Sequence, residues 1–367
     1  MHQRLAFIDT LRGIAVLSVV LQHALEQVVL TNTTGEYYWW FHNATGHYFN
    51  FGRFGVVLFF FVSGFVIPYS FPKSETPIRD FAVSRFFRLY PTYWLSILAF
   101  VLLAPMMGIA SIPLYQIGVN ITMFQMFVNV PPIRIAYWTL AIELMFYVGC
   151  VALFALGWLN QRMTAFYIVV LASLVAIIAF PLTGNRVVWA LLEISLNLAS
   201  MFFGKVMRDT VINKQLRWWH VAICTILYCL FAAAVASRRF GGEYHENFFH
   251  AYSIGSAYVV AALMFMLFAA FGDRMAWRFM SFVGLISYSV YLMGAYTMVF
   301  IMYFFGAGRT PLEWLLFTVG VLAASVLVSW LTYLVVEKPF IALGRKFRSQ
   351  SSGAHALRPS LSSQGAE

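Results

Sequence analysis

Long runs of apolar residues constrain this chain more than any other feature of its sequence. Ten stretches of nearly 18 or more residues carry little charge, and about 20 helical residues cross the hydrocarbon core of a bilayer. Hydrophobic residues make up 61% of the chain and charged residues 10%, against roughly 45–50% and about 25% in soluble domains. Since lipid satisfies no backbone polar group and the runs are longer than barrel strands, we predict an all-α, polytopic integral membrane protein.

We expect about ten transmembrane helices. The predicted spans are 11–30, 55–71, 91–110, 138–158, 164–181, 187–206, 217–236, 251–271, 281–305 and 312–335. The stretch 113–130 is apolar but is interrupted or bounded by Pro113, Asn120, Asn129 and Pro131, and we interpret it as an interfacial or re-entrant segment, with an eleventh span as the alternative. Residues 1–346 would form one membrane domain. Residues 347–367 would be a disordered cytoplasmic tail, because Ser349 to Glu367 is rich in Ser, Gly and Ala.

The positive charges indicate the orientation of the chain. With ten spans, the N-terminus, the even-numbered loops and the tail share one side, which carries eighteen of the 24 lysines and arginines. The positive-inside rule places that side, and both termini, in the cytoplasm. The net charge of +10 therefore requires no nucleic-acid partner, although it would attract anionic membrane lipid or a polyanionic cofactor.

The first span carries two ionisable residues, Arg12 and His23. Charged groups in a membrane are expensive and mark functional sites. Eleven residues of helix place both side chains on one face, about 16 Å apart along the axis, with Asp9 able to pair with Arg12. A catalytic pair and a structural pair, with His23 as an interhelical hydrogen-bonding group and Arg12 as an interface anchor, are equally weighted alternatives.

Further candidates lie in the next spans. Ser63-Gly64 offers a nucleophile, although small residues in a span more often permit close helix packing. Arg85 and Arg88 share a helix face at the cytoplasmic interface, where they either signal orientation or bind phosphate.

Glu143 is a carboxylate well inside the fourth span that needs a partner. Arg12 and His23 are the candidates, and we expect the pair with His23. Such a pair fixes the tautomer of a general base. Tyr288 belongs to a group of hydroxyl side chains in the ninth span. These side chains either belong to the functional site or serve only helix packing. No role is assigned to Glu193. The three cysteines have no disulfide or metal spacing, and we expect no metal.

Several segments, in this order, resemble the membrane-bound acyltransferase-3 family of bacterial O-acyltransferases acting on carbohydrates. The resemblance spans about residues 5–346. The segments that carry it are Arg12 with His23, Phe60 to Phe65, Arg85 to Pro91, Trp138 to Tyr147, Ile286 to Leu292 and Glu337 to Phe340. One departure is that many relatives carry a histidine where this chain has Met293, which puts in doubt any role for a second histidine there.

The resemblance implies an enzyme of the bacterial cytoplasmic (inner) membrane that transfers an acyl group other than aminoacyl. The donor would be a cytoplasmic acyl-CoA, most often acetyl-CoA, and the acceptor a hydroxyl of a surface or lipid-linked carbohydrate. His23 would act as general base with Glu143 and Arg12 as catalytic partners, and Arg12, Arg85, Arg88, Ser63 and Tyr288 would contact the donor. The acceptor glycan, the identity of the acyl group and the oligomeric state stay open.

A purely scaffolding membrane subunit, which would tolerate loss of His23, is one alternative function. The other is a transporter or flippase for a polyprenyl-linked glycan. It would use the histidine and the glutamate for proton coupling, and it predicts paired broken helices with internal repeat symmetry. The sequence shows neither feature.

Overall fold

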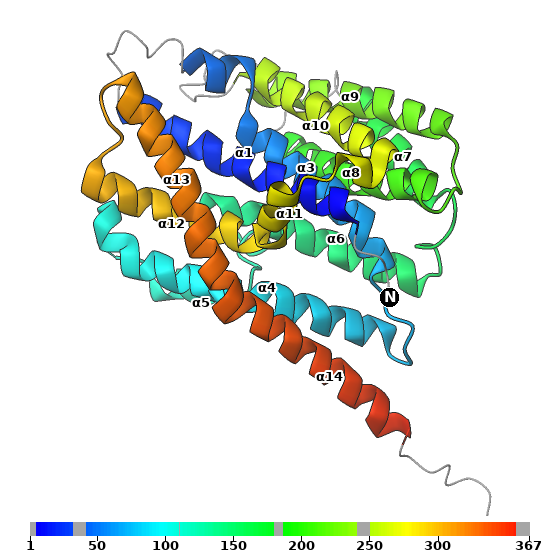
Figure 1. The fold of residues 1–367 in the computed structure, drawn as a ribbon. Helices are drawn as coiled ribbons and strands as arrows, with labels where there is room; N and C mark the ends of the chain where they lie inside the picture. Colours follow the sequence, from blue (N-terminus) through cyan, green and yellow to red (C-terminus); the bar gives the residue numbers. More distant parts are fainter. Residues whose placement is uncertain (1–4, 32–41, 110, 180–185, 241–249, 357–367) are drawn as a thin grey trace, which may run out of the picture.

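The computed structural model describes residues 5–31, 42–109, 111–179, 186–240 and 250–356. Within those residues the chain is a bundle of helices without a strand (Figure 1). The α-helices are α1 Ala6–Thr31, α3 Phe51–Val66, α4 Pro77–Leu103, α5 Leu114–Ile121, α6 Trp138–Ala155, α7 Thr164–Ala179, α8 Arg186–Val211, α9 Trp218–Phe240, α10 Ala251–Phe271, α11 Arg278–Leu285, α12 Ser287–Phe305, α13 Pro311–Thr332 and α14 Lys338–Ala356. The 3-10 and π-helical turns are η1 Asn43–Tyr48, η2 Ile67–Tyr69, η3 Ala104–Met107, η4 Ile135–Tyr137, η5 Gly272–Met275 and η6 Tyr333–Glu337.

The membrane architecture agrees with the prediction of an all-α polytopic protein. Nine of the described helical segments are long and apolar enough to cross a bilayer, and α7 is apolar but only 16 residues long. Together these ten segments coincide with the ten predicted spans. Helix α5 has 8 residues, which is about 12 Å of helix. It is too short to cross, so the eleventh span is excluded.

Two predicted boundaries are wrong. The ninth span is not continuous, because α11 ends at Leu285 and α12 begins at Ser287, with Ile286 at φ −97° and ψ 8° between them. The last span continues through the π-turn η6 into α14, which reaches Ala356 and therefore includes ten residues of the expected tail. Residues 357–367 lie outside the described part.

Glycines let the central helices pack backbone against backbone. A Cβ on Gly13 would lie 2.1 Å from the carbonyl oxygen of Met280, and one on Gly284 would lie 1.8 Å from that of Asp9, so α1 and α11 are in direct contact. Helix α3 approaches α8 equally closely, since a Cβ on Gly64 would lie 1.6 Å from the carbonyl oxygen of Met201. The packing interpretation of Gly64 is confirmed.

We predict that Gly64→Ala destabilises the bundle by about 1–3 kcal/mol, the usual range for overpacking. The added methyl group meets backbone, which cannot turn aside as a side chain can. Gly149→Ala is the matched control, because it lies in α6 with no atom within 4 Å of its added Cβ. It should stabilise by about 0.5–1 kcal/mol through helix propensity. Unfolding midpoints of both variants in detergent check the opposite signs, and equal midpoints would contradict the packing argument.

Candidate active site

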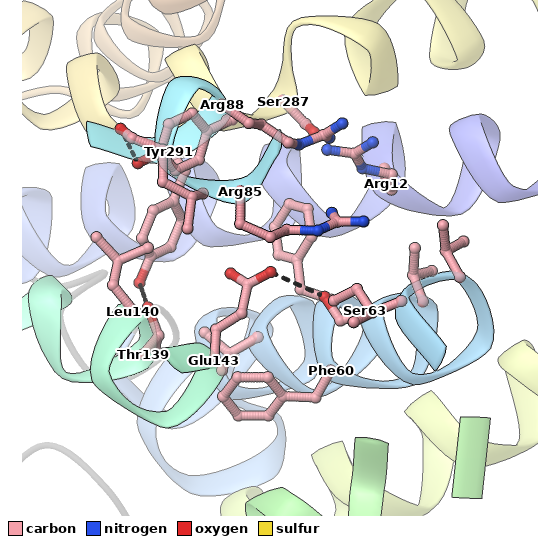
Figure 2. Close-up of a pocket in the computed structure, with 17 residues that line it drawn as sticks. Arg12, Phe60, Ser63, Arg85, Arg88, Thr139, Leu140, Glu143, Ser287 and Tyr291 are labelled. Carbon is pink, nitrogen blue, oxygen red and sulfur yellow. Dashed lines mark hydrogen bonds between the residues drawn. The ribbon is translucent and has the colours of Figure 1, made fainter. Parts of the chain in front are cut away.

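A cavity of about 130 Å³ lies among α1, α3, α4, α6 and α12, and we call it the arginine cavity (Figure 2). It is lined by six of the seven site residues predicted from the sequence. These are Arg12, Ser63, Arg85, Arg88, Glu143 and Tyr288. Residues up to 276 positions apart in the chain are thus brought to one place, and only His23 is absent from the lining.

The arginine cavity is electropositive. Its lining contains the guanidinium groups of Arg12, Arg85 and Arg88 against a single carboxylate. Arg85 Nη2 donates a hydrogen bond to Ser70 Oγ at 2.5 Å. The same guanidinium carbon lies 5.5 Å from the Tyr147 ring centroid, a cation–π contact. A lining with two net positive charges is suited to an anionic ligand.

Glu143 provides that carboxylate. Its Oε1 accepts a hydrogen bond from Tyr147 Oη at 2.6 Å and a longer one from Ser63 Oγ at 3.5 Å (Figure 2). The expected pair between Glu143 and His23 is therefore wrong, because α6 directs Glu143 toward the arginines rather than toward the imidazole. The structure also places a carboxylate beside Ser63, where the sequence indicated no base.

The break between α11 and α12 opens directly onto the arginine cavity. Ser287 is the first residue of α12, and its buried hydroxyl has no hydrogen-bond partner among the described residues. The positive end of the α12 dipole adds to the charge of the cavity. Tyr288 follows it and donates from Oη to the carbonyl oxygen of Leu89 at 2.8 Å, which ties α12 to α4.

His23 lies farther along α1 with an acidic partner of its own. Its Nδ1 is 3.0 Å from Glu26 Oε2. The other carboxylate oxygen accepts a hydrogen bond from Gln22 Nε2 at 3.0 Å, and Gln22 Oε1 accepts one from the backbone N–H of Phe51 at 2.9 Å. A carboxylate at Nδ1 favours the tautomer that leaves the Nε2 lone pair free. Glu26 was missed from the sequence, although its i, i+3 spacing from His23 was visible.

A second, smaller cavity of about 20 Å³ lies beside the imidazole, and we call it the histidine cavity. Its lining includes His23, Arg134 and Tyr291. The volume is enough for about one water molecule. The side chain of His23 is itself 39% exposed, so the imidazole is also accessible from outside this cavity.

Tyr291 lines both cavities, and it is the one residue their linings share. Its hydroxyl donates to the carbonyl oxygen of Ala136 at 2.9 Å and is 2.7 Å from Thr139 Oγ1. The phenol side chain therefore lies between the three arginines and His23. Its two partners on η4 and α6 hold it there.

The remaining candidates have structural partners or lie apart. Glu193 forms an ion pair with Arg53 at 3.3 Å, which joins α8 to α3. Glu337 is buried and accepts a hydrogen bond from Ser289 Oγ at 2.7 Å, which joins α12 to η6. Among the described residues, no group of three His, Cys, Asp or Glu side chains is arranged to hold a metal ion.

The comparisons with known proteins identify the family. A model of the acyltransferase-3 family, described as an acyltransferase domain, matches residues 5–334. The chain belongs to the acyltransferase-3 family. It is therefore a multi-pass membrane acyltransferase, in agreement with the motifs found in the sequence. Neither the curated proteins nor the solved structures gave a match.

We predict that the arginine cavity of this acyltransferase is reached from the cytoplasm. Ser63→Cys should react with a membrane-impermeant thiol reagent in inside-out vesicles and not in right-side-out vesicles, because the charged lining keeps the cavity hydrated. Ser173→Cys, at a fully buried position of α7, is the matched control and should stay unlabelled. The unsubstituted chain gives the background from Cys150, Cys224 and Cys229. Labelling of Ser63→Cys in right-side-out vesicles alone would show that the cavity opens on the opposite side of the membrane and would contradict the predicted orientation.

Proposed function

We propose that this acyltransferase moves an acyl group, acetyl in the first instance, from cytoplasmic acyl-CoA to a hydroxyl of a surface or lipid-linked carbohydrate in the bacterial cytoplasmic membrane. The observation that carries the proposal is the arrangement on either side of Tyr291. Three arginines line one cavity, and a His–Glu pair stands beside the other.

The arginine cavity is the donor side of the proposed reaction. Arg12, Arg85 and Arg88 supply the charge that an anionic donor requires, and Arg is suited to bidentate contact with phosphate. Eleven residues of α1 separate Arg12 from His23 by about 16 Å, comparable to an extended pantetheine arm. A donor whose charged end is held by the arginines can thus present its thioester near the imidazole.

His23 is the general base in this proposal. Nε2 takes the proton of the acceptor hydroxyl while its oxygen attacks the thioester carbonyl carbon. The carbon–sulfur bond then breaks, and the imidazolium returns the proton to the leaving thiolate, which gives the ester and free CoA. Glu26 stabilises the imidazolium through Nδ1, the role first assigned to Glu143.

Tyr291 has to turn aside before the thioester reaches His23. The histidine cavity holds about one water molecule, so an acyl group fits there only when the phenol leaves its partners Thr139 and Ala136. The acceptor approaches the imidazole from its exposed side.

Glu143 takes a donor-side role instead. It lies among the arginines, bonded to Tyr147 and Ser63, and so fixes the shape and charge of the cavity. Its position also keeps open a variant in which Ser63 carries the acyl group covalently. Intact mass measurement after incubation with acetyl-CoA and no acceptor separates the two routes, since direct transfer leaves the protein mass unchanged.

The transporter alternative lacks its structural feature in the described part of the chain. One span is broken there, at Ile286, and no second break of that kind matches it.

We predict that His23→Ala lowers kcat for acetyl-CoA turnover with acceptor by about 10²–10⁴-fold, the usual contribution of a general base. Release of free CoA by the purified protein is the measurement. His47→Ala, an exposed histidine in η1, is the control and should keep wild-type turnover. Equal CoA release by wild type and His23→Ala would remove His23 from the mechanism.

We predict that Glu26→Gln and Glu143→Gln, two equal chemical changes, affect different kinetic constants. Glu26→Gln should lower kcat, by up to the roughly 10⁴-fold known for the carboxylate of a Ser-His-Asp triad, and leave the KM for acetyl-CoA near wild type. Glu143→Gln should change mainly the KM for acetyl-CoA, because its contacts lie in the arginine cavity. If instead Glu143→Gln lowered kcat and Glu26→Gln changed mainly the KM, Glu143 rather than Glu26 would be the partner of His23.

A further inference from the structure

A third cavity, of about 190 Å³, lies between α4 and α14 and shares Arg85 and Arg88 with the arginine cavity. We call it the outer cavity. Two more arginines, Arg345 and Arg348 of α14, line it, and its lining contains no acidic residue. Four guanidinium groups around one small space repel one another, and an anion in their midst removes that repulsion.

The helices hold this cluster in place. A Cβ on Gly344 would lie 2.8 Å from Phe87 Cβ, so the glycine lets α14 approach α4 closely. One turn on, the Phe347 ring stacks on Phe87 with centroids 5.3 Å apart and planes at 16°. These contacts fix the backbone of α14 against α4, so that Arg345, which is exposed, and the half-buried Arg348 lie opposite Arg85 and Arg88.

Two of the arginines also have unused donors. The Nε atoms of Arg85 and Arg348 are buried and have no hydrogen-bond partner among the described residues. A buried donor without a partner is destabilising, and a guanidinium fork matches phosphate oxygens in pairs. Charge and hydrogen bonding thus indicate the same kind of ligand, one that carries phosphate.

We propose that Arg345 and Arg348 extend the donor site: the outer cavity binds the phosphate on the ribose of the donor's nucleotide end, the diphosphate lies at Arg85 and Arg88, which line both cavities, and the pantetheine arm runs on into the arginine cavity. This rests on the proposed function and assigns two further residues, Arg345 and Arg348 of α14, to its donor site. An anionic lipid presents the same phosphate chemistry at the membrane surface, so the test includes a lipid arm.

The test compares donors of decreasing charge with purified, full-length protein in detergent. The KM values for acetyl-CoA, acetyl-3′-dephospho-CoA and acetyl-pantetheine are measured for wild type and for the double variant Arg345→Ala, Arg348→Ala. Lys346→Ala is the matched control, because this lysine lies between the two arginines in sequence, is exposed and does not line the cavity.

The double variant should raise the KM for acetyl-CoA by about tenfold to a hundredfold, as expected for loss of charge-assisted hydrogen bonds. The KM for acetyl-pantetheine, which has no nucleotide, should change less than twofold, and kcat should stay at the wild-type value. Lys346→Ala should match wild type with all three donors. An equal change for every donor, or no change, overturns the proposal.

A separate binding measurement distinguishes failure of the inference from failure of the proposed function. Adenosine 3′,5′-bisphosphate should raise the thermal unfolding midpoint of wild type and not that of the double variant, whether or not the protein consumes a thioester. Absence of that shift in wild type overturns the outer-cavity proposal. A shift produced by phosphatidylglycerol alone, lost in the double variant while the donor KM values stay unchanged, assigns the cavity to lipid and overturns it as well.

Discussion

Placing a guanidinium group in hydrocarbon costs a large amount of free energy, and this chain brings three of them together among its helices. The helices solve the problem by arranging Arg12, Arg85 and Arg88 around a shared space and by placing Glu143 opposite them. Direct backbone contacts at Gly13 and Gly284 make this possible, because they set α1 against the break between α11 and α12. The charge cluster and the tight glycine packing are therefore two parts of one arrangement.

The sequence predicted much of this arrangement because depth in a membrane helix follows from position in the chain. Arg12, Arg85 and Arg88 were all expected near one interface, and the structure gathers them in one cavity. Which helix faces which does not follow from depth, and that is why the partner assigned to His23 was wrong. The pair with Glu26 could have been predicted from the sequence, since Glu26 lies on the same helix three residues after His23. The break at Ile286 could not be predicted, because Ile286 is neither Gly nor Pro and the nearby Gly284 lies within α11.

In the proposed reaction, residues of one helix serve two substrates. Helix α1 contributes Arg12 to the donor side and the His23–Glu26 pair to the acceptor side, so its length sets the separation of the two reacting ends. The hydrogen bonds from Gln22 to Glu26 and from Phe51 to Gln22 fix that helix against α3. In the proposed reaction the helix sets the distance between the phosphate-binding region and the base.

Tyr291 has a consequence for the fate of the thioester. A thioester beside a general base is hydrolysed whenever water takes the place of the sugar hydroxyl, and each such event would consume a donor without product. The histidine cavity has room for about one water molecule, and the phenol stands between that water and the arginine side. In the proposed reaction, a single aromatic side chain, held by Thr139 and Ala136, thus separates the acyl group from the base until the phenol turns aside.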